Sequence, residues 1–206
     1  MLTVAMATVF ALSLLAGSAS ALRSIEIGAS ETTLVLNGRM TFTNPVSDII
    51  CNATVTKTIS RAFPKTSGIL IGKITRIDTA RVREANCRLA GEELFRRLES
   101  IEFLLEGEER GRIYYNAILG TLPNITGILF LIKQLRGGFV ISRERCLYEP
   151  PVEGSGVLAE VSRGVIGRLR LLRNTQGLVV GGGLCPGSGE LRETLTPLQT
   201  TTIRLV

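Results

Sequence analysis

The sequence predicts an all-β fold, an antiparallel β-sandwich or barrel-like domain of roughly ten strands. Two observations carry this prediction. Many short apolar runs rich in β-branched residues end at glycine or proline, which is typical of strands joined by turns rather than of alternating strands and helices. A loose internal duplication also divides the chain into two similar halves, about 30–111 and 112–206. We therefore expect one domain, 22–206, built from two related strand-rich units.

The duplication is marked by the four cysteines of the chain, Cys51, Cys87, Cys146 and Cys185. Ile-Gly-Lys-Ile at 71–74 follows the first of them at the same offset at which Ile-Gly-Arg-Leu at 166–169 follows the third. A Gly-Glu pair likewise follows Cys87 and Cys185 at equal offsets. Each half therefore contains one pair of cysteines in a similar sequence context.

An even number of cysteines in an exported chain is typical of disulfides, because oxidising compartments let them persist. Four cysteines allow three pairings, and the duplication favours Cys51–Cys87 with Cys146–Cys185. Closing loops of this length stabilises a fold by about 4 kcal/mol per disulfide in the chain-entropy model. Free buried cysteines are the alternative.

The first 21 residues contain no charged side chain and end in Ala19-Ser20-Ala21, a typical cleavage signal. We interpret 1–21 as a signal peptide and expect the mature chain to begin at Leu22. An uncleaved membrane anchor is the alternative, although the apolar run is short for a span of about 20 residues. No later stretch is apolar enough to span a membrane, so the expected location is secreted, extracellular or associated with the cell envelope.

The strands are expected in the following order. Residues 33–42 are predicted to form a tight hairpin around Asn37-Gly38, because both residues accept positive φ. Residues 49–59 alternate with threonines like a half-buried strand, and 68–82 is expected to be a strand with a bulge near Gly72. Further strands are predicted in the second half at 113–119, 127–133, 138–142, 157–161, 165–172, 178–180 and 200–206.

Residues 92–105 are ambiguous. Leu94, Leu98, Ile101 and Leu105 recur at helical spacing, and glutamates precede arginines by four residues. Ile101, Phe103 and Leu105 also alternate like a strand. We predict one helix near 92–105, with a strand as the open alternative.

Several segments carry a resemblance to a protein class. Cys51-Asn52-Ala53-Thr54-Val55-Thr56, the closing Cys87, the stretch 119–126 and the end Cys185-Pro186-Gly187-Ser188-Gly189 are similar to uncharacterised secreted proteins of actinobacteria. The resemblance implies an exported all-β protein without an assigned activity or known functional residues.

The chain contains no histidine, which removes the commonest general base near neutral pH and the commonest neutral metal ligand. Paired cysteines would not supply a thiolate. No metal site, cofactor motif, nucleic-acid motif or catalytic residue is therefore predicted. An exported glycosidase-like hydrolase using two of the glutamates in 92–109 is the alternative function, although these glutamates lie among arginines like a solvated, ion-paired surface.

The candidate binding residues are basic. A net charge of +6 and a pI near 9.5 favour anionic partners such as an envelope polymer. Arg168 and Arg170 fall on one face of a predicted strand, and Lys73 is the residue equivalent to Arg168 in the duplication. We therefore expect a non-enzymatic secreted or envelope-associated protein with a structural or binding role, holding an anionic partner through Lys73, Arg168 and Arg170. A solvated surface without a ligand is the alternative for these residues.

Overall fold

A computed structural model describes residues 24–28, 33–43, 47–79, 87–91, 98–121, 124–150 and 154–206. Within these ranges the protein is all-β, as predicted, and its fifteen strands belong to one antiparallel sheet with no helix. The strands are β1 (Ser24–Gly28), β2 (Thr33–Thr43), β3 (Ser47–Ile59), β4 (Ala62–Pro64), β5 (Leu70–Thr79), β6 (Cys87–Gly91), β7 (Leu98–Leu104), β8 (Arg112–Thr121), β9 (Asn124–Lys133), β10 (Arg136–Ile141), β11 (Glu144–Glu149), β12 (Ser155–Ser162), β13 (Val165–Val180), β14 (Ser188–Pro197) and β15 (Thr201–Leu205).

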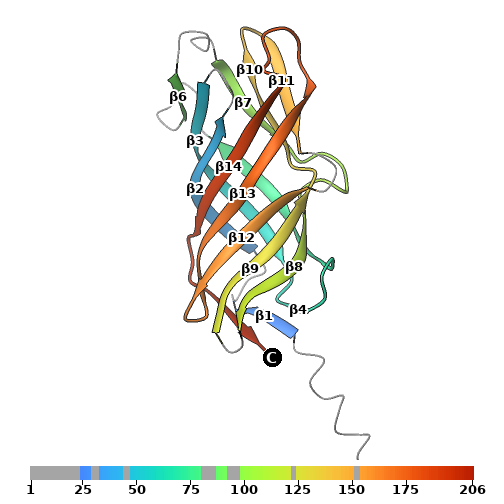
Figure 1. Ribbon diagram of the computed structural model, residues 1–206, viewed down its shortest axis with the longest axis vertical. Coiled ribbons are helices and arrows are strands. Elements are labelled where there is room, and N and C mark those ends of the chain that lie inside the picture. Colours follow the sequence, from blue (N-terminus) through green and yellow to red (C-terminus); the bar gives the residue numbers. More distant parts are fainter. Residues whose placement is uncertain are drawn as a thin grey trace, which may run out of the picture.

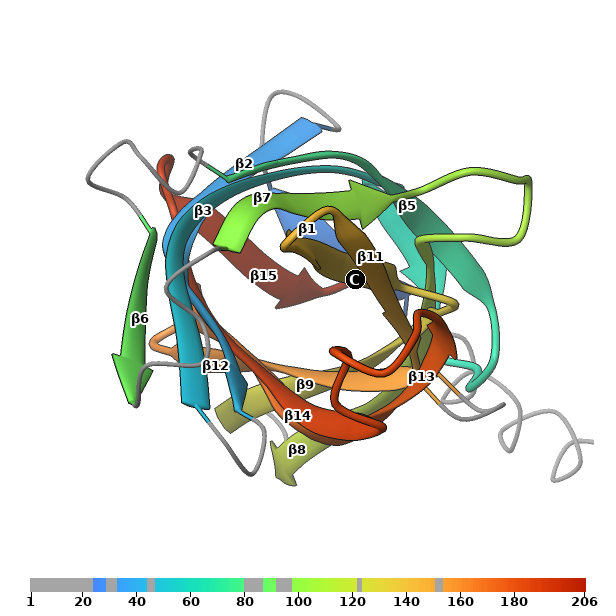
Figure 2. The same ribbon diagram turned by 90° about the horizontal axis from the view of Figure 1, so that it is seen from above.

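Eight of these strands close into a ring, which settles the choice between sandwich and barrel. The order is β12-β9-β8-β5-β3-β2-β14-β13, and a pairing between β13 and β12 joins the two ends. Figure 2 shows the ring from above. Closing the sheet satisfies the backbone groups that the edge strands of an open sheet would leave unpaired.

Four long strands, β2, β3, β13 and β14, continue beyond the ring at one end (Figure 1). We call this end, together with β6, β7, β10 and β11, the extension. Residues 53–59 of β3 pair with β5 in the ring, whereas 47–51 pair with β6. Residues 165–171 of β13 pair with β12, whereas 177–180 pair with β11, which continues through β10 to β7. At the opposite end β15 pairs with the start of β13, and β1 pairs with β15 and β4.

Each part of the molecule has its own hydrophobic core. The ring encloses the larger cluster, whose most completely buried side chains include Ile25, Leu36, Ile128 and Leu195. The extension holds a smaller cluster that contains all four half-cystines together with Phe139 and Tyr148. Both predicted disulfides, Cys51–Cys87 and Cys146–Cys185, are present, so the predicted pairing is confirmed.

The predicted hairpin at 33–42 is wrong, because β2 runs straight through Asn37-Gly38. Gly38 serves a different purpose: a Cβ at this position would overlap the carbonyl oxygen of Thr194 on β14. The glycine therefore lets two backbones approach closely inside the ring instead of making a turn.

The predicted helix near 92–105 is also wrong over its described part, where 98–104 form β7 and pair with β10; residues 92–97 lie outside the described residues. The alternation of Ile101 with Phe103 had indicated a strand, and this alternative agrees with the structure. Glu102 of β7 accepts a hydrogen bond from Arg145 of β11 at 2.7 Å. Strand pairing supplied by β10 thus overrides a local helical spacing.

The bulge expected near Gly72 is confirmed by a shift of the β5–β8 register between Leu70 and Gly72. The duplication stays a prediction: Cys51 lies within β3 and Cys146 within β11. The signal peptide at 1–21 lies outside the described residues. None of the described segments forms a helix with the length and hydrophobicity that crossing a membrane requires.

Candidate functional site

The three predicted binding residues lie on two opposite walls of the ring. Lys73 is on β5 and Arg168 and Arg170 are on β13, and these strands are four places apart in either direction around the ring. Arg168 and Arg170 are exposed on one face of β13, with the buried Leu169 between them. The structure therefore places Lys73 apart from Arg168 and Arg170 and not on one surface with them.

The arginines of β13 differ in how they are neutralised. Arg170 forms an ion pair with Glu160 of β12, with 2.7 Å between Nε and Oε1. Arg168 forms no ion pair with any carboxylate in the part of the chain that the structure describes. Of these two guanidinium groups, that of Arg168 is therefore the one that is open to a ligand.

A third arginine lies in the same cross-strand row as Arg170. In the register of the sheet Arg170 lies opposite Thr194 of β14, and Thr194 lies opposite Arg39 of β2. Neighbouring strands are ~4.8 Å apart, so the backbones of the two arginines are separated by about 10 Å. Arg39 is exposed and has no ion pair among the described residues.

Arg192 completes the group. It is exposed on β14, two residues from Thr194, and is thus a diagonal neighbour of both Arg39 and Arg170 at about 7–8 Å. Its Nη2 contacts Glu190 at 3.2 Å. We call Arg39, Arg168, Arg170 and Arg192 the arginine cluster. Two of its four charges are balanced by Glu160 and Glu190 and two are not.

Hydroxyl groups surround the arginine cluster. Thr194 lies at its centre, and Thr196 and Thr41 lie in the neighbouring rows. Arginine donates in a planar fork that matches phosphate, sulfate and carboxylate oxygens, and threonine adds neutral hydrogen bonds. The sequence analysis missed Arg39 and Arg192, because the first was assigned to a turn and the second lies on a strand that was not predicted.

The acidic segment does not converge on a reaction centre among the described residues. Glu102 pairs with Arg145, and Glu109 pairs with Arg112 at 2.9 Å. The described residues contain no group of three or more cysteine, aspartate or glutamate side chains that could hold a metal ion. Glu92 and Glu93 lie outside the described residues.

Two buried charged groups lie inside the ring instead. Lys57 of β3 and Glu193 of β14 are 3% and 7% exposed. Burial lowers the pKa of the Lys57 ammonium and raises the pKa of the Glu193 carboxyl, and the attraction between the two groups partly opposes both shifts. Glu193 Oε1 accepts no hydrogen bond from the described residues. Neither residue lines the arginine cluster, which faces outward.

Comparison with protein-family models, with curated proteins and with solved structures finds no match. The functional argument therefore rests on the geometry of the arginine cluster.

Proposed function

We propose that this protein is a non-enzymatic binding protein of the extracellular space or the cell envelope, and that the arginine cluster holds an anionic polymer. The observation that carries the proposal is the cross-strand row in which Arg170 and Arg39 flank Thr194, with Arg168 and Arg192 beside it. Four guanidinium groups on a closed, disulfide-containing sheet present a fixed array of donors. A repeating anion can contact several of them at once, which raises the effective concentration at each further contact.

The arginines that have no ion pair are expected to contribute most to binding. Arg39 and Arg168 are not ion-paired within the described chain, whereas Arg170 and Arg192 already contact carboxylates. An anion gains the most from the first two, because they need not leave a partner. Binding should weaken as salt rises, since exposed charges are screened over about 10 Å at 0.1 M ionic strength.

The test is the affinity of the mature chain, 22–206, for heparin as a sulfated polymer, with dextran as the neutral control. The Arg39→Gln/Arg168→Gln variant is expected to raise the Kd for heparin about tenfold at low salt, because each exposed charge contact contributes up to ~1 kcal/mol. The Arg168→Gln/Arg170→Gln variant should lose less, since Arg170 is already paired with Glu160 and would have to leave it to contact the polymer. Calorimetric titration at several salt concentrations measures both effects.

A matched control separates the cluster from net charge. Lys65 and Lys73 are exposed away from the arginine cluster, and Lys65→Gln/Lys73→Gln removes the same charge. This variant should keep its heparin affinity within about twofold. Equal losses in the two charge variants, or binding that ignores salt, would show that the cluster is not the site.

A further inference from the structure

A cleft lies at the end of the ring opposite the extension, where β9 and β12 separate (Figure 1). The two strands pair only as far as Glu160 and Gly127, so 124–126 of β9 pair with no residue of β12. β15 borders the gap, because the backbone nitrogen of Ile203 donates to the carbonyl oxygen of Gly164 in the turn between β12 and β13. The described lining of the cleft contains no residue of the arginine cluster.

The floor of the cleft is apolar. Val161 of β12 and Ile203 of β15 are buried, and Ile125 of β9 and Leu205 of β15 are half-buried. The cleft has a volume of about 740 Å³. Sites for small organic ligands usually have volumes of about 300–1,000 Å³ and mostly apolar walls. The size and the floor of the cleft therefore suit a small ligand with an apolar part.

The rim of the cleft is cationic. Its described lining includes Arg163 and Arg204 and no acidic side chain. Arg204 is already occupied, because its Nε contacts Glu26 at 2.7 Å. Arg163 is exposed and forms no ion pair with any described residue. Ser162, the preceding residue, adds an exposed hydroxyl to the same rim. An anionic group of a ligand would therefore find the guanidinium of Arg163 open.

The backbone at Arg163 is unfavourable for an arginine. Arg163 and Gly164 form the two-residue turn between β12 and β13, with φ of 50° and 73°. Asparagine, aspartate and glycine are the usual residues where a hairpin turn needs positive φ at its first position. Residues held in sparsely populated backbone conformations gather at functional sites. The turn itself does not call for an arginine, so we attribute its presence to the guanidinium on the rim of the cleft.

We propose that the cleft binds a single-chain anionic amphiphile, a fatty acid, whose alkyl chain lies on the apolar floor and whose carboxylate contacts Arg163. The guanidinium donates in a planar fork that matches the two carboxylate oxygens. A purely apolar ligand would leave this guanidinium unused, and an inorganic anion would leave the floor to water. The cleft shares no described residue with the arginine cluster, so this site adds to the proposed polymer binding and does not depend on it.

The two parts of such a ligand contribute differently to its affinity. Each methylene that is buried on the floor should tighten binding by up to about fourfold, so the affinity should rise with chain length. The carboxylate adds less, because Arg163 is exposed and water screens its charge. We expect the contact with Arg163 to contribute up to about fivefold and to weaken as salt rises.

The test compares octanoate with butanoate, which has a shorter chain, and with 1-octanol, which has no charge. Dissociation constants come from NMR titrations of the mature chain, 22–206. Octanoate is expected to bind at least about tenfold more tightly than butanoate, because it carries four more methylenes. The largest shifts of resonances should fall on Ile125, Val161 and Ile203, which form the floor.

The Arg163→Asn variant separates the charge from the turn. Asparagine accepts a positive φ better than arginine does, so this variant should unfold at the temperature of the native protein or above it. It should bind octanoate up to about fivefold more weakly and should bind 1-octanol as the native protein does. A loss that is limited to octanoate reports on the guanidinium and not on damage to the fold.

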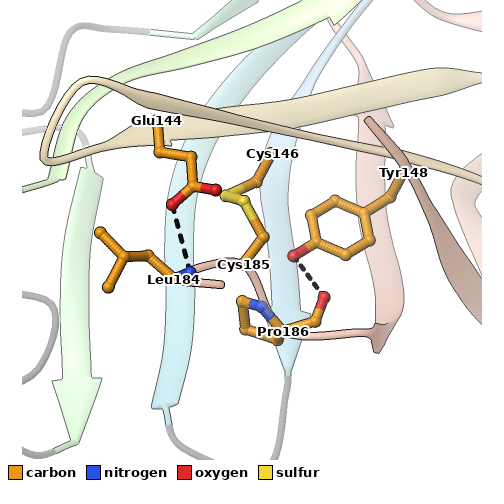
Figure 3. Close-up of a disulfide and its surroundings, with 6 residues drawn as sticks. All are labelled: Glu144, Cys146, Tyr148, Leu184, Cys185 and Pro186. Atoms are coloured by element: carbon orange, nitrogen blue, oxygen red, sulfur yellow. Dashed lines mark hydrogen bonds between the residues drawn. A yellow bond between two sulfur atoms is a disulfide. The ribbon is translucent and has the colours of Figure 1, made fainter. Parts of the chain in front are cut away.

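Arg143→Asn is the matched control. Arg143 also has a positive φ, of 72°, and lies in the turn between β10 and β11 at the other end of the molecule. The next residue, Glu144, accepts a hydrogen bond from the backbone of Leu184 beside the Cys146–Cys185 disulfide, so this turn belongs to the extension (Figure 3). The variant removes the same charge and should keep the affinity for octanoate within about twofold.

The proposal fails if octanoate does not shift the resonances of the cleft, or if it binds no more tightly than butanoate. It also fails if Arg163→Asn binds octanoate no more weakly than Arg143→Asn does. Binding to phosphatidylglycerol vesicles without binding to octanoate would assign the cleft to a membrane surface and overturn the free ligand. Arg39→Gln/Arg168→Gln should keep its octanoate affinity and Arg163→Asn its heparin affinity, so the two sites are tested separately.

Discussion

At the scale of single residues, Lys57 and Glu193 depart from the rule that interior positions of a strand carry apolar side chains. Residues 51–59 of β3 alternate between interior and surface, and this alternation places Lys57 in the same interior row as Val55 and Ile59. Glu193 occupies the equivalent interior position between Leu191 and Leu195 on β14. A pair of this kind is weak evidence for stability, since desolvation of both charges opposes their attraction.

The raised pKa of Glu193 predicts how stability depends on pH. Above its ordinary pKa of 4.5 the carboxyl keeps its proton in the folded state but loses it on unfolding. The folded state then binds more protons, so the free energy of unfolding falls as pH rises from about 4.5. The lowered pKa of Lys57 acts with opposite sign and in the alkaline window below 10.5.

Replacing Glu193 with glutamine should therefore flatten the fall in stability as pH rises above 4.5. Urea unfolding at several pH values measures the slope, and Glu106→Gln, at an exposed position, controls for the loss of a negative charge. An unchanged slope in Glu193→Gln would mean that the carboxyl stays ionised throughout this range.

At the scale of elements, β2 and β7 show what strand pairing adds to a local pattern. The Asn37-Gly38 signal for a turn is strong in isolation, yet β2 is extended because it pairs on both sides, with β3 and with β14. β7 follows the same rule, because its helical spacing yields to pairing with β10. One partner of β2, β14, and the partner of β7, β10, are distant in sequence from the strands they pair with.

The role of Gly38 predicts an effect of adding a single methyl group. Gly38→Ala should lower the free energy of unfolding by about 1–3 kcal/mol, because the new Cβ meets the backbone of Thr194 and Leu195, which cannot move aside as a side chain would. Gly167→Ala is the matched control, since a Cβ at this strand position meets nothing within 4 Å. Urea unfolding of both variants checks the prediction, and equal stability would show that Gly38 is no close contact.

At the scale of the whole molecule, two cores are joined through the long strands β2, β3, β13 and β14. Both disulfides belong to the smaller core of the extension, and none of their cysteines contributes to the larger core. Stability need not be uniform in such a molecule, because parts with fewer buried contacts open independently.

Removing the disulfides should therefore lower the local stability of the extension before that of the ring. In a variant with all four cysteines changed to serine, amide exchange is expected to rise in β7, β10 and β11 and to stay slow in β8, β9 and β12. Each lost disulfide costs about 2–5 kcal/mol, which acts mainly on the extension. Hydrogen exchange followed by mass spectrometry resolves these strands. A uniform rise in all strands would instead indicate one cooperative unit.

The sequence by itself determined the β class and the alternation of interior and surface residues, and it favoured the observed pairing of the cysteines among three possible pairings. The first two features depend on properties with a short range: a side-chain period of two and the residues that end strands. Arg168 and Arg170 could be assigned to one face for the same reason.

Only the tertiary structure decided which strands meet. The pairing of β2 with β14 brings Arg39 beside Thr194 and Arg170, although these residues are more than a hundred positions apart in the chain. The same closure separates Lys73 from Arg168. Strand order depends on the total burial and backbone pairing of the closed ring, and no local pattern of residues encodes that sum.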